Sequence, residues 1–252
     1  MALFPAALLA LSACARKTPQ TRVLFDEGHA QQFRAGSDGP LDLSGLAALF
    51  FDHDASVGTS REAITDNALS NVDVLIISGP FAPILPAEME AITRFLDNGG
   101  RLCVMLHIAA PAADLLHQLD VSISNGVIRE RENIIGDDPV NFRVTRLAPD
   151  TLTKDLPGFD VYGAWALLST GGDATIVART SPLAWIDLNG DHTLGPADAV
   201  QSFAVAVAGP RGKGRFAVFG DDAIFQNRFL VGDNLLLGKH LVSWLNRRPA
   251  TD

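Results

Sequence analysis

Residues 72–106, VDVLIISGPFAPILPAEMEAITRFLDNGGRLCVML, have the pattern of a strand, a helix and a second strand. The runs at 72–77 and 102–106 are almost entirely apolar, which is typical of strands buried on both faces of a parallel sheet. Between them, residues 86–98 carry apolar side chains at helical spacing, with proline at the start and Asn-Gly-Gly at the end. The stretch therefore predicts a βαβ unit.

The same alternation continues on either side of this unit. Two more apolar runs, 23–25 and 216–219, predict strands, and the apolar spacing over 41–51 and 234–246 predicts helices. Strands that alternate with helices favour an α/β fold with a doubly wound, mostly parallel sheet. We expect a single domain of this class over residues 22–248.

One part of the chain departs from this alternation. Over residues 121–208 the pattern changes to short β-like runs, which we interpret as a β-rich insertion in the same domain. The sequence GPRGKG at 209–214 contains four turn-forming residues, and it predicts a turn between two antiparallel strands.

Composition limits the classes of partner. The 252 residues are 47% hydrophobic, enough for a sizeable core, and 29 acidic residues outnumber 20 basic ones, giving a net charge of −9. A basic face for nucleic acid is therefore not expected. No internal apolar run reaches the roughly 18 residues that a spanning helix needs.

The N-terminus has the layout of a bacterial export signal, with a short apolar stretch and small residues before Cys14. Leu11-Ser12-Ala13-Cys14 resembles the lipobox of bacterial lipoproteins. The resemblance implies a signal peptide over 1–13, lipidation of Cys14 and a tether over 14–21, so that the protein is anchored to a membrane on the periplasmic side of the cell envelope. The alternative is a cytosolic protein in which Cys14 has no role.

Several segments together resemble the class I glutamine amidotransferase-like fold, a flavodoxin-like architecture. They are VLFDEGH at 23–29, DVLIISGP at 73–80, FLDNGGRLCVML at 95–106 and the segment from 212 to 245, GKGRFAVFGDDAIFQNRFLVGDNLLLGKHLVSWL. The order is most similar to the non-catalytic branch of that fold, which occurs in gliding-motility transporter subunits and intraflagellar-transport proteins.

The catalytic members of that fold place a cysteine nucleophile on a tight turn after the strand that follows the Gly-Gly pair. Here that strand ends Leu106-His107-Ile108-Ala109-Ala110, and Cys103 lies earlier, within the strand. The resemblance therefore implies no glutaminase activity. It implies a ligand- or partner-binding lipoprotein, an accessory to a transporter or motility system with an envelope protein as partner. The alternatives are a hydrolase that acts through a metal at the carboxyl edge of the sheet, and a purely structural envelope protein.

The segment DLNGDHTLGPAD, residues 187–198, resembles a calcium loop of the EF-hand or dockerin type. Calcium prefers six or more oxygen ligands, and oxygen donors recur here at loop positions 1, 3, 5, 7 and 12. These ligands would be Asp187, Asn189, Asp191, the carbonyl of Thr193, and Asp198. His192 stands where that family has glycine, and strand-like flanks replace the helices, so a polar connector is the alternative. Calcium, in a structural role, is the one cofactor that the sequence suggests.

Parallel strands of one sheet end at the same edge, and ligands bind in the crevice outside those carboxyl ends. The polar residues after the four apolar strands are therefore our candidates for a ligand-binding site: Asp26, Glu27, His29, Ser78, Gly79, His107, Asp221, Asp222 and Asn227. Clustered carboxylates repel one another unless a cation, a helix N-terminus or a hydroxyl-rich ligand offsets them. We expect the carboxylates of Asp26 and Asp221 to lie within about 10 Å of each other. The alternative is that these carboxylates only cap turns and a helix.

Overall fold

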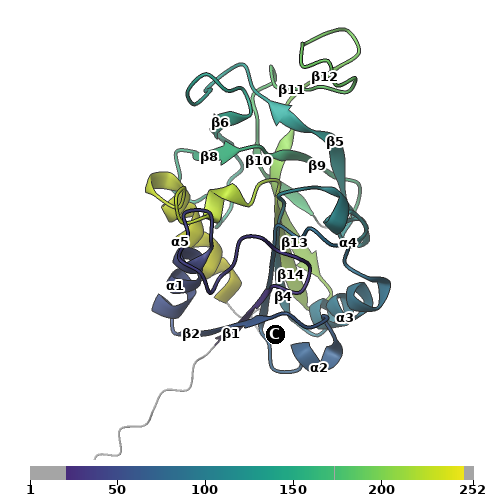
Figure 1. The fold of residues 1–252 in the computed structure, drawn as a ribbon, viewed down its shortest axis with the longest axis vertical. Coiled ribbons are helices and arrows are strands. Elements are labelled where there is room, and N and C mark those ends of the chain that lie inside the picture. Colours follow the sequence, from purple (N-terminus) through teal and green to yellow (C-terminus); the bar gives the residue numbers. More distant parts are fainter. Residues whose placement is uncertain (1–20, 173, 247–252) are drawn as a thin grey trace, which may run out of the picture.

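The computed structural model describes residues 21–172 and 174–246 (Figure 1). The predicted signal peptide, Cys14, and the tether up to residue 20 lie outside the described residues. None of the helices in the described ranges is long and apolar enough to cross a membrane.

Five parallel strands form one end of the main sheet, in the order β2-β1-β3-β4-β14. Every residue of β3 and of β4 is buried, as the apolar sequences of these two strands predicted. The sequence did not reveal β2, because it is a half-exposed edge strand with the sequence ASVGTS and has no apolar run. The five strands are β1 (Thr21–Asp26), β2 (Ala55–Ser60), β3 (Val74–Ser78), β4 (Arg101–Met105) and β14 (Gly214–Phe219).

Helices cover both faces of the parallel strands (Figure 1). One hydrophobic cluster joins Val74 and Ile76 of β3 to helices α1 and α5, and the other joins Leu75 and Ile77 to helices α2, α3 and α4. Each large side chain buried in this way contributes about 1.5–3 kcal/mol. The helices are α1 (Ser44–Asp52), α2 (Asp66–Leu69), α3 (Pro86–Asp97), α4 (Ala113–Gln118) and α5 (Gly232–Asn246), with short 3₁₀ helices η1 (Ala110–Ala112) and η2 (Ala223–Phe225).

Antiparallel strands continue the sheet beyond β14, so the β-rich portion of the sequence belongs to the same sheet. The predicted connection between two antiparallel strands is confirmed, because β13 pairs with β14, but the turn itself is confined to Gly212 and Lys213, since residues 209–211 and 214 belong to the paired strands. The additional strands are β13 (Ala204–Arg211), β9 (Trp165–Ser169), β5 (Val121–Arg129), β11 (Trp185–Ile186) and β12 (Ala199–Val200), with β10 (Thr175–Arg179) and β7 (Arg146–Leu147) on a branch. A separate two-stranded sheet contains β6 (Asn141–Val144) and β8 (Phe159–Tyr162).

The start of β14 passes so close to the end of α3 that only glycine fits there. A Cβ at Gly214 would overlap the carbonyl oxygen of Gly100 and lie 2.7 Å from that of Leu96. The Gly214→Ala variant should therefore lower the free energy of unfolding by about 1–3 kcal/mol, measured by urea denaturation. Gly58→Ala is the matched control, because its Cβ would meet no described atom within 4 Å, and it should be neutral or slightly stabilising. Equal stability of the two variants would contradict this close approach.

Candidate functional site

Polar residues follow four parallel strands at one edge of the sheet. Asp26 and Ser78 are the last residues of β1 and β3, and His107 follows the end of β4 by two positions. Asp221 and Asp222 follow β14. Because these strands are parallel, the structure brings all five residues to the carboxyl edge.

The edge nevertheless contains two separate groups of side chains. Strands β3 and β4 lie between β1 and β14, so three strand spacings, roughly 14 Å, separate the strand ends that carry Asp26 and Asp221. The expected approach of these two carboxylates to about 10 Å therefore has no support in the strand order. One group surrounds His29 and the other surrounds His107.

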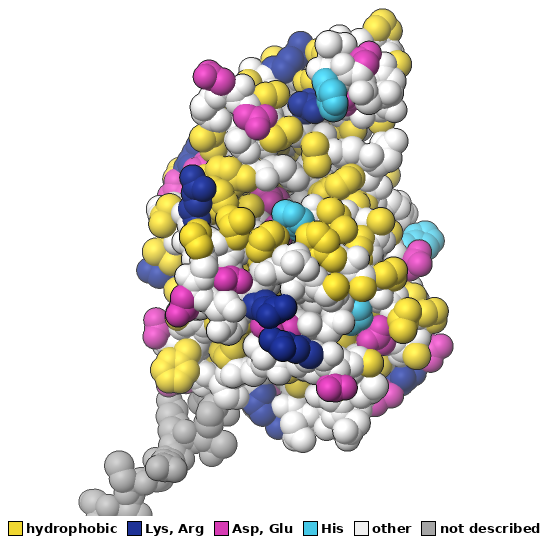
Figure 2. Space-filling model, viewed as in Figure 1, with side chains coloured by type: hydrophobic (Ala, Val, Ile, Leu, Met, Phe, Trp, Pro, Cys, Tyr) yellow, Lys and Arg dark blue, Asp and Glu magenta, His cyan; other side chains and the backbone are white. Residues whose placement is uncertain are grey.

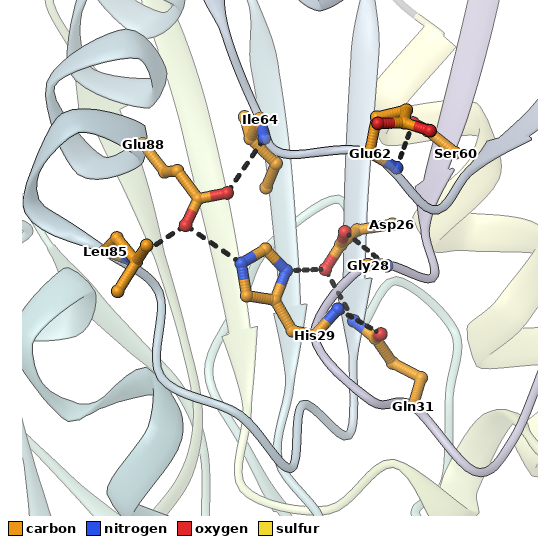
Figure 3. A network of polar contacts seen from close by, with 9 residues as sticks. All are labelled: Asp26, Gly28, His29, Gln31, Ser60, Glu62, Ile64, Leu85 and Glu88. Carbon is orange, nitrogen blue, oxygen red and sulfur yellow. Dashed lines mark hydrogen bonds and ion pairs between the residues drawn. The ribbon is translucent and has the colours of Figure 1, made fainter.

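In the first group a buried imidazole lies between two buried carboxylates (Figure 3). Nδ1 of His29 is 2.7 Å from Oδ2 of Asp26, and Nε2 is 3.1 Å from Oε2 of Glu88. The side-chain amide of Gln31 donates to Asp26, and the backbone amide of His29 donates to Oε1 of Gln31 at 2.8 Å. Both ring nitrogens of His29 thus face an acceptor.

These contacts decide the charge of His29. Burial alone would lower the pKa of this imidazole, but the hydrogen bonds and charges of Asp26 and Glu88 outweigh it and raise the pKa from 6.5 to about 9. Burial alone would raise the pKa of Glu88, but the amides of Leu85 and Ile64, together with His29, lower it. At neutral pH the group is therefore an imidazolium between carboxylates.

This group also fixes the neighbouring loops. The carbonyl of His29 accepts hydrogen bonds from the amides of Phe81 and Ala82, which lie in the loop after β3. The carboxylate of Glu88 accepts from the amides of Leu85 and Ile64, and in doing so it caps the start of α3 (Figure 3). His29 and its partners therefore hold three segments that surround the carboxyl edge.

The second group centres on His107, whose side chain is 39% exposed. Nδ1 of His107 is 3.1 Å from Oδ1 of Asp222, which is completely buried. The imidazole ring also lies against two aromatic rings, with centroid distances of 5.0 Å to Phe33 and 5.4 Å to Phe81. The hydrogen bond to Asp222 raises the pKa of His107, although burial opposes this shift. The protonated form of His107 is thus favoured, and its imidazole ring contacts two aromatic side chains.

Two buried polar atoms near this edge have no hydrogen-bond partner among the described residues: Oγ of Ser78 and Oδ2 of Asp222, the residue that bonds to His107. Gly79 follows Ser78 in the chain, and a Cβ at Gly79 would lie only 2.6 Å from Oδ2 of Asp222 and 3.2 Å from Cβ of His107. The φ of +52° at Gly79 favours glycine independently. Buried polar atoms are normally paired, so these two mark a place where water or a ligand atom would be stabilised.

A family model described as a domain of unknown function, DUF4350, matches residues 35–242. The chain belongs to the DUF4350 family. No curated protein sequence matches it. Among solved structures, it is similar to the mmIFT52 N-terminal domain, with a TM-score of 0.71 and 18% identity over 89% of this chain and 97% of that one.

Two bacterial structures are also similar to this DUF4350 domain. A ThuA-like protein from Bacteroides uniformis has a TM-score of 0.52 and 15% identity, over 96% of this chain and 95% of that one. Cytoplasmic Protein STM1381 from Salmonella typhimurium LT2 has a TM-score of 0.56 and 14% identity, over 89% of this chain and 99% of that one. Identities this low establish a shared fold and nothing about activity.

Three of the candidate site residues have structural roles in this DUF4350 domain. Both carboxylate oxygens of Asp221 accept from backbone amides, those of Tyr162 and Ala223, and burial raises its pKa to about 7. The side chain of Asn227 bonds to Gly39, Ser44 and Gly45, which fixes the start of α1. Glu27 accepts from the amide of Ala35 and lies 3.8 Å from Arg61. These side chains are thus engaged within the protein, and a ligand-binding role for them stays a prediction.

The sequence did not single out four residues that complete the two groups: Gln31, Phe33, Phe81 and Glu88. The proline at the start of α3 with a glutamate two positions later is a known pattern of helix capping, and it was the only available signal for Glu88. Phe33 and Phe81 lie in irregular loops, where no periodicity identifies the neighbours of a side chain.

The predicted calcium loop is held by hydrogen bonds within itself. Asp187 accepts from the amides of Gly190 and His192, and Asp191 accepts from the amide and hydroxyl of Thr193. His192 has a φ of +62°, the conformation that this loop position requires. Over residues 21–172 and 174–246, no three His, Cys, Asp or Glu side chains are grouped so that they could hold a metal ion. The carboxylates of this loop therefore bond mainly to the loop's own amides and hydroxyl, and calcium binding stays a prediction.

The charge of His29 makes stability depend on pH. Because its pKa is about 9 in the folded protein and 6.5 in a free imidazole, its stabilising effect is fully present below pH 6.5 and is lost as the pH rises through 9. The difference in unfolding free energy between the wild type and His29→Gln should therefore shrink between pH 6.5 and pH 9.5, measured by chemical denaturation. His117→Gln, at an exposed position in α4, is the control. A difference that stays constant over this range would contradict a charged His29.

Proposed function

We propose that this DUF4350 domain binds a ligand or protein partner at the carboxyl edge of its sheet and does not catalyse a reaction there. The observation that carries the proposal is His107. It follows β4, the strand after which the resemblance to the catalytic amidotransferases would place a nucleophile, and it presents an imidazole there in place of a thiol or hydroxyl. Nε2 of His107 has no partner among the described residues and belongs to a partly exposed side chain.

The surroundings of His107 favour binding. The rings of Phe33 and Phe81 both contact its imidazole, and Phe81 is 37% exposed. Hydrophobic side chains also extend across the middle of the face seen in Figure 2. A polar group between aromatic side chains is typical of small-molecule and peptide sites, where apolar contact provides affinity and a few polar groups provide orientation.

We also propose that the fold is amidotransferase-like, with flavodoxin-like winding. The strand order β2-β1-β3-β4-β14 supports this proposal, because it corresponds to the order 2-1-3-4-5 of flavodoxin-like sheets. The similarity to the mmIFT52 N-terminal domain supports a place in the non-catalytic branch that includes intraflagellar-transport proteins. On this basis the partner is a protein of the cell envelope, in a transporter or motility system.

The location belongs to the same proposal. The lipobox-like residues before Cys14 support a lipid anchor on the periplasmic side of the envelope, and the excess of acidic residues argues against a nucleic acid as partner. Incorporation of a labelled fatty acid that is lost in Cys14→Ala is the direct check on the anchor.

A hydrolase that acts through a metal at the same edge is the second candidate. Within the described ranges, however, no cluster of three metal-ligating His, Cys, Asp or Glu side chains is assembled. At the carboxyl edge, Asp26, Asp221 and Asp222 are already engaged with His29, backbone amides and His107. Binding is therefore the better-supported function.

Photo-crosslinking tests the proposal in the native cell. A benzoylphenylalanine in place of Phe81 should give a discrete adduct, because that ring lies beside His107 and is exposed. The same replacement at Phe51 is the matched control, since this ring is 73% exposed on α1. His107→Ala should reduce the adduct from position 81 severalfold, and His117→Ala should leave it unchanged. Equal labelling from positions 81 and 51 would contradict a site at the carboxyl edge.

A further inference from the structure

The antiparallel half of the sheet divides at β13. Ala204 is the one residue of β13 that pairs with β9, through Leu167, whereas β10 pairs with β13 from Ala204 to Ala208. β9 and β10 therefore lie on two branches that separate from a common strand (Figure 1). The wedge between the branches is a groove of about 300 Å³, and it shares no lining residue with the group around His107.

Apolar side chains form most of the groove. Ile123, Leu167 and Phe203 line it from β5, β9 and the segment before β13, and Ile176 lines it from β10. Leu168 also lines the groove and is 61% exposed, an unusual exposure for a leucine in a strand. Pockets of this volume with apolar walls are typical of small-ligand sites.

Two arginines stand at one side of this apolar wedge. Arg179 of β10 lines the groove, and Arg146 of β7 is its register partner on the next strand. Like charges directly opposite each other on antiparallel strands repel. Both side chains are exposed, and neither guanidinium forms an ion pair or side-chain hydrogen bond with any residue in the described ranges. A chain with a net charge of −9 thus keeps two uncompensated cations beside an apolar groove.

We propose that this groove binds a small amphipathic carboxylate. Its apolar chain lies between Leu168 and Ile176, and its carboxylate bonds to Arg179 and neutralises the Arg146–Arg179 pair. An uncharged apolar ligand would fill the groove but would not reduce the repulsion between Arg146 and Arg179. A simple anion would reduce this repulsion but would leave the apolar surface of the groove exposed. The site is independent of the proposed function at the carboxyl edge.

Titration with octanoate tests this proposal, followed by calorimetry and by the NMR signals of the Ile and Leu methyl groups. The wild type should bind octanoate with shifts confined to Ile123, Leu167, Leu168 and Ile176. Arg179→Gln should weaken binding at least tenfold, because it removes the charged donor that bonds to the carboxylate. Arg146→Gln and Leu168→Ser should each weaken it severalfold.

The controls separate this site from general charge and apolar effects. Lys239→Gln removes one positive charge from an exposed position on α5 and should leave the affinity unchanged. Octanol, which has the same chain without the charge, should bind at least tenfold more weakly than octanoate. Equal affinity for octanol, unchanged binding by Arg179→Gln, or no binding of octanoate at millimolar concentration would each overturn the proposal. Binding to phosphatidylglycerol vesicles without any shift by octanoate would also overturn it, because the surface would then recognise a bilayer.

Discussion

The buried imidazolium of His29, held between Asp26 and Glu88, is the interaction on which the carboxyl edge depends. Three ionisable side chains lie almost out of water there, and removal of His29 would leave two buried carboxylates without their counter-charge. The amides of Gly28, Ile64 and Leu85 and the side chain of Gln31 occupy further carboxylate lone pairs. The arrangement is stable because its hydrogen bonds compensate for the loss of water.

This constraint extends from the end of β1 to the surface that we propose binds a partner. The carbonyl of His29 holds the loop that carries Phe81, and Phe81 in turn contacts His107. Asp222 holds the other side of His107 from the loop after β14. The position of His107 therefore depends on contacts from several loops that are distant in sequence. Because buried side chains hold these loops, the position of His107 is well defined. Such preorganisation favours binding because little order has to be gained when a partner arrives.

The spacing of apolar residues in the sequence was sufficient to predict those strands and helices whose residue types are determined by burial alone. The apolar runs at 72–77 and 102–106 became β3 and β4, and the helix over 86–98 became α3 (Pro86–Asp97). The parallel arrangement also placed Asp26, Ser78 and His107 at one edge. Short strands such as β7 and β11 were beyond reach, because distant pairing creates them and their own sequences do not. For the same reason, the sequence could not show that Asp221 bonds to the amide of Tyr162, or that Glu88 lies next to His29.

The charge state of His29 tests this account most directly. Both ring nitrogens should carry a proton at pH 8, which the ¹⁵N chemical shifts of the imidazole report without any mutation, and the titration should have its midpoint near pH 9. Observation of a neutral imidazole at pH 8, with a midpoint at or below the ordinary value of 6.5, would contradict the claim that a buried imidazolium organises the carboxyl edge.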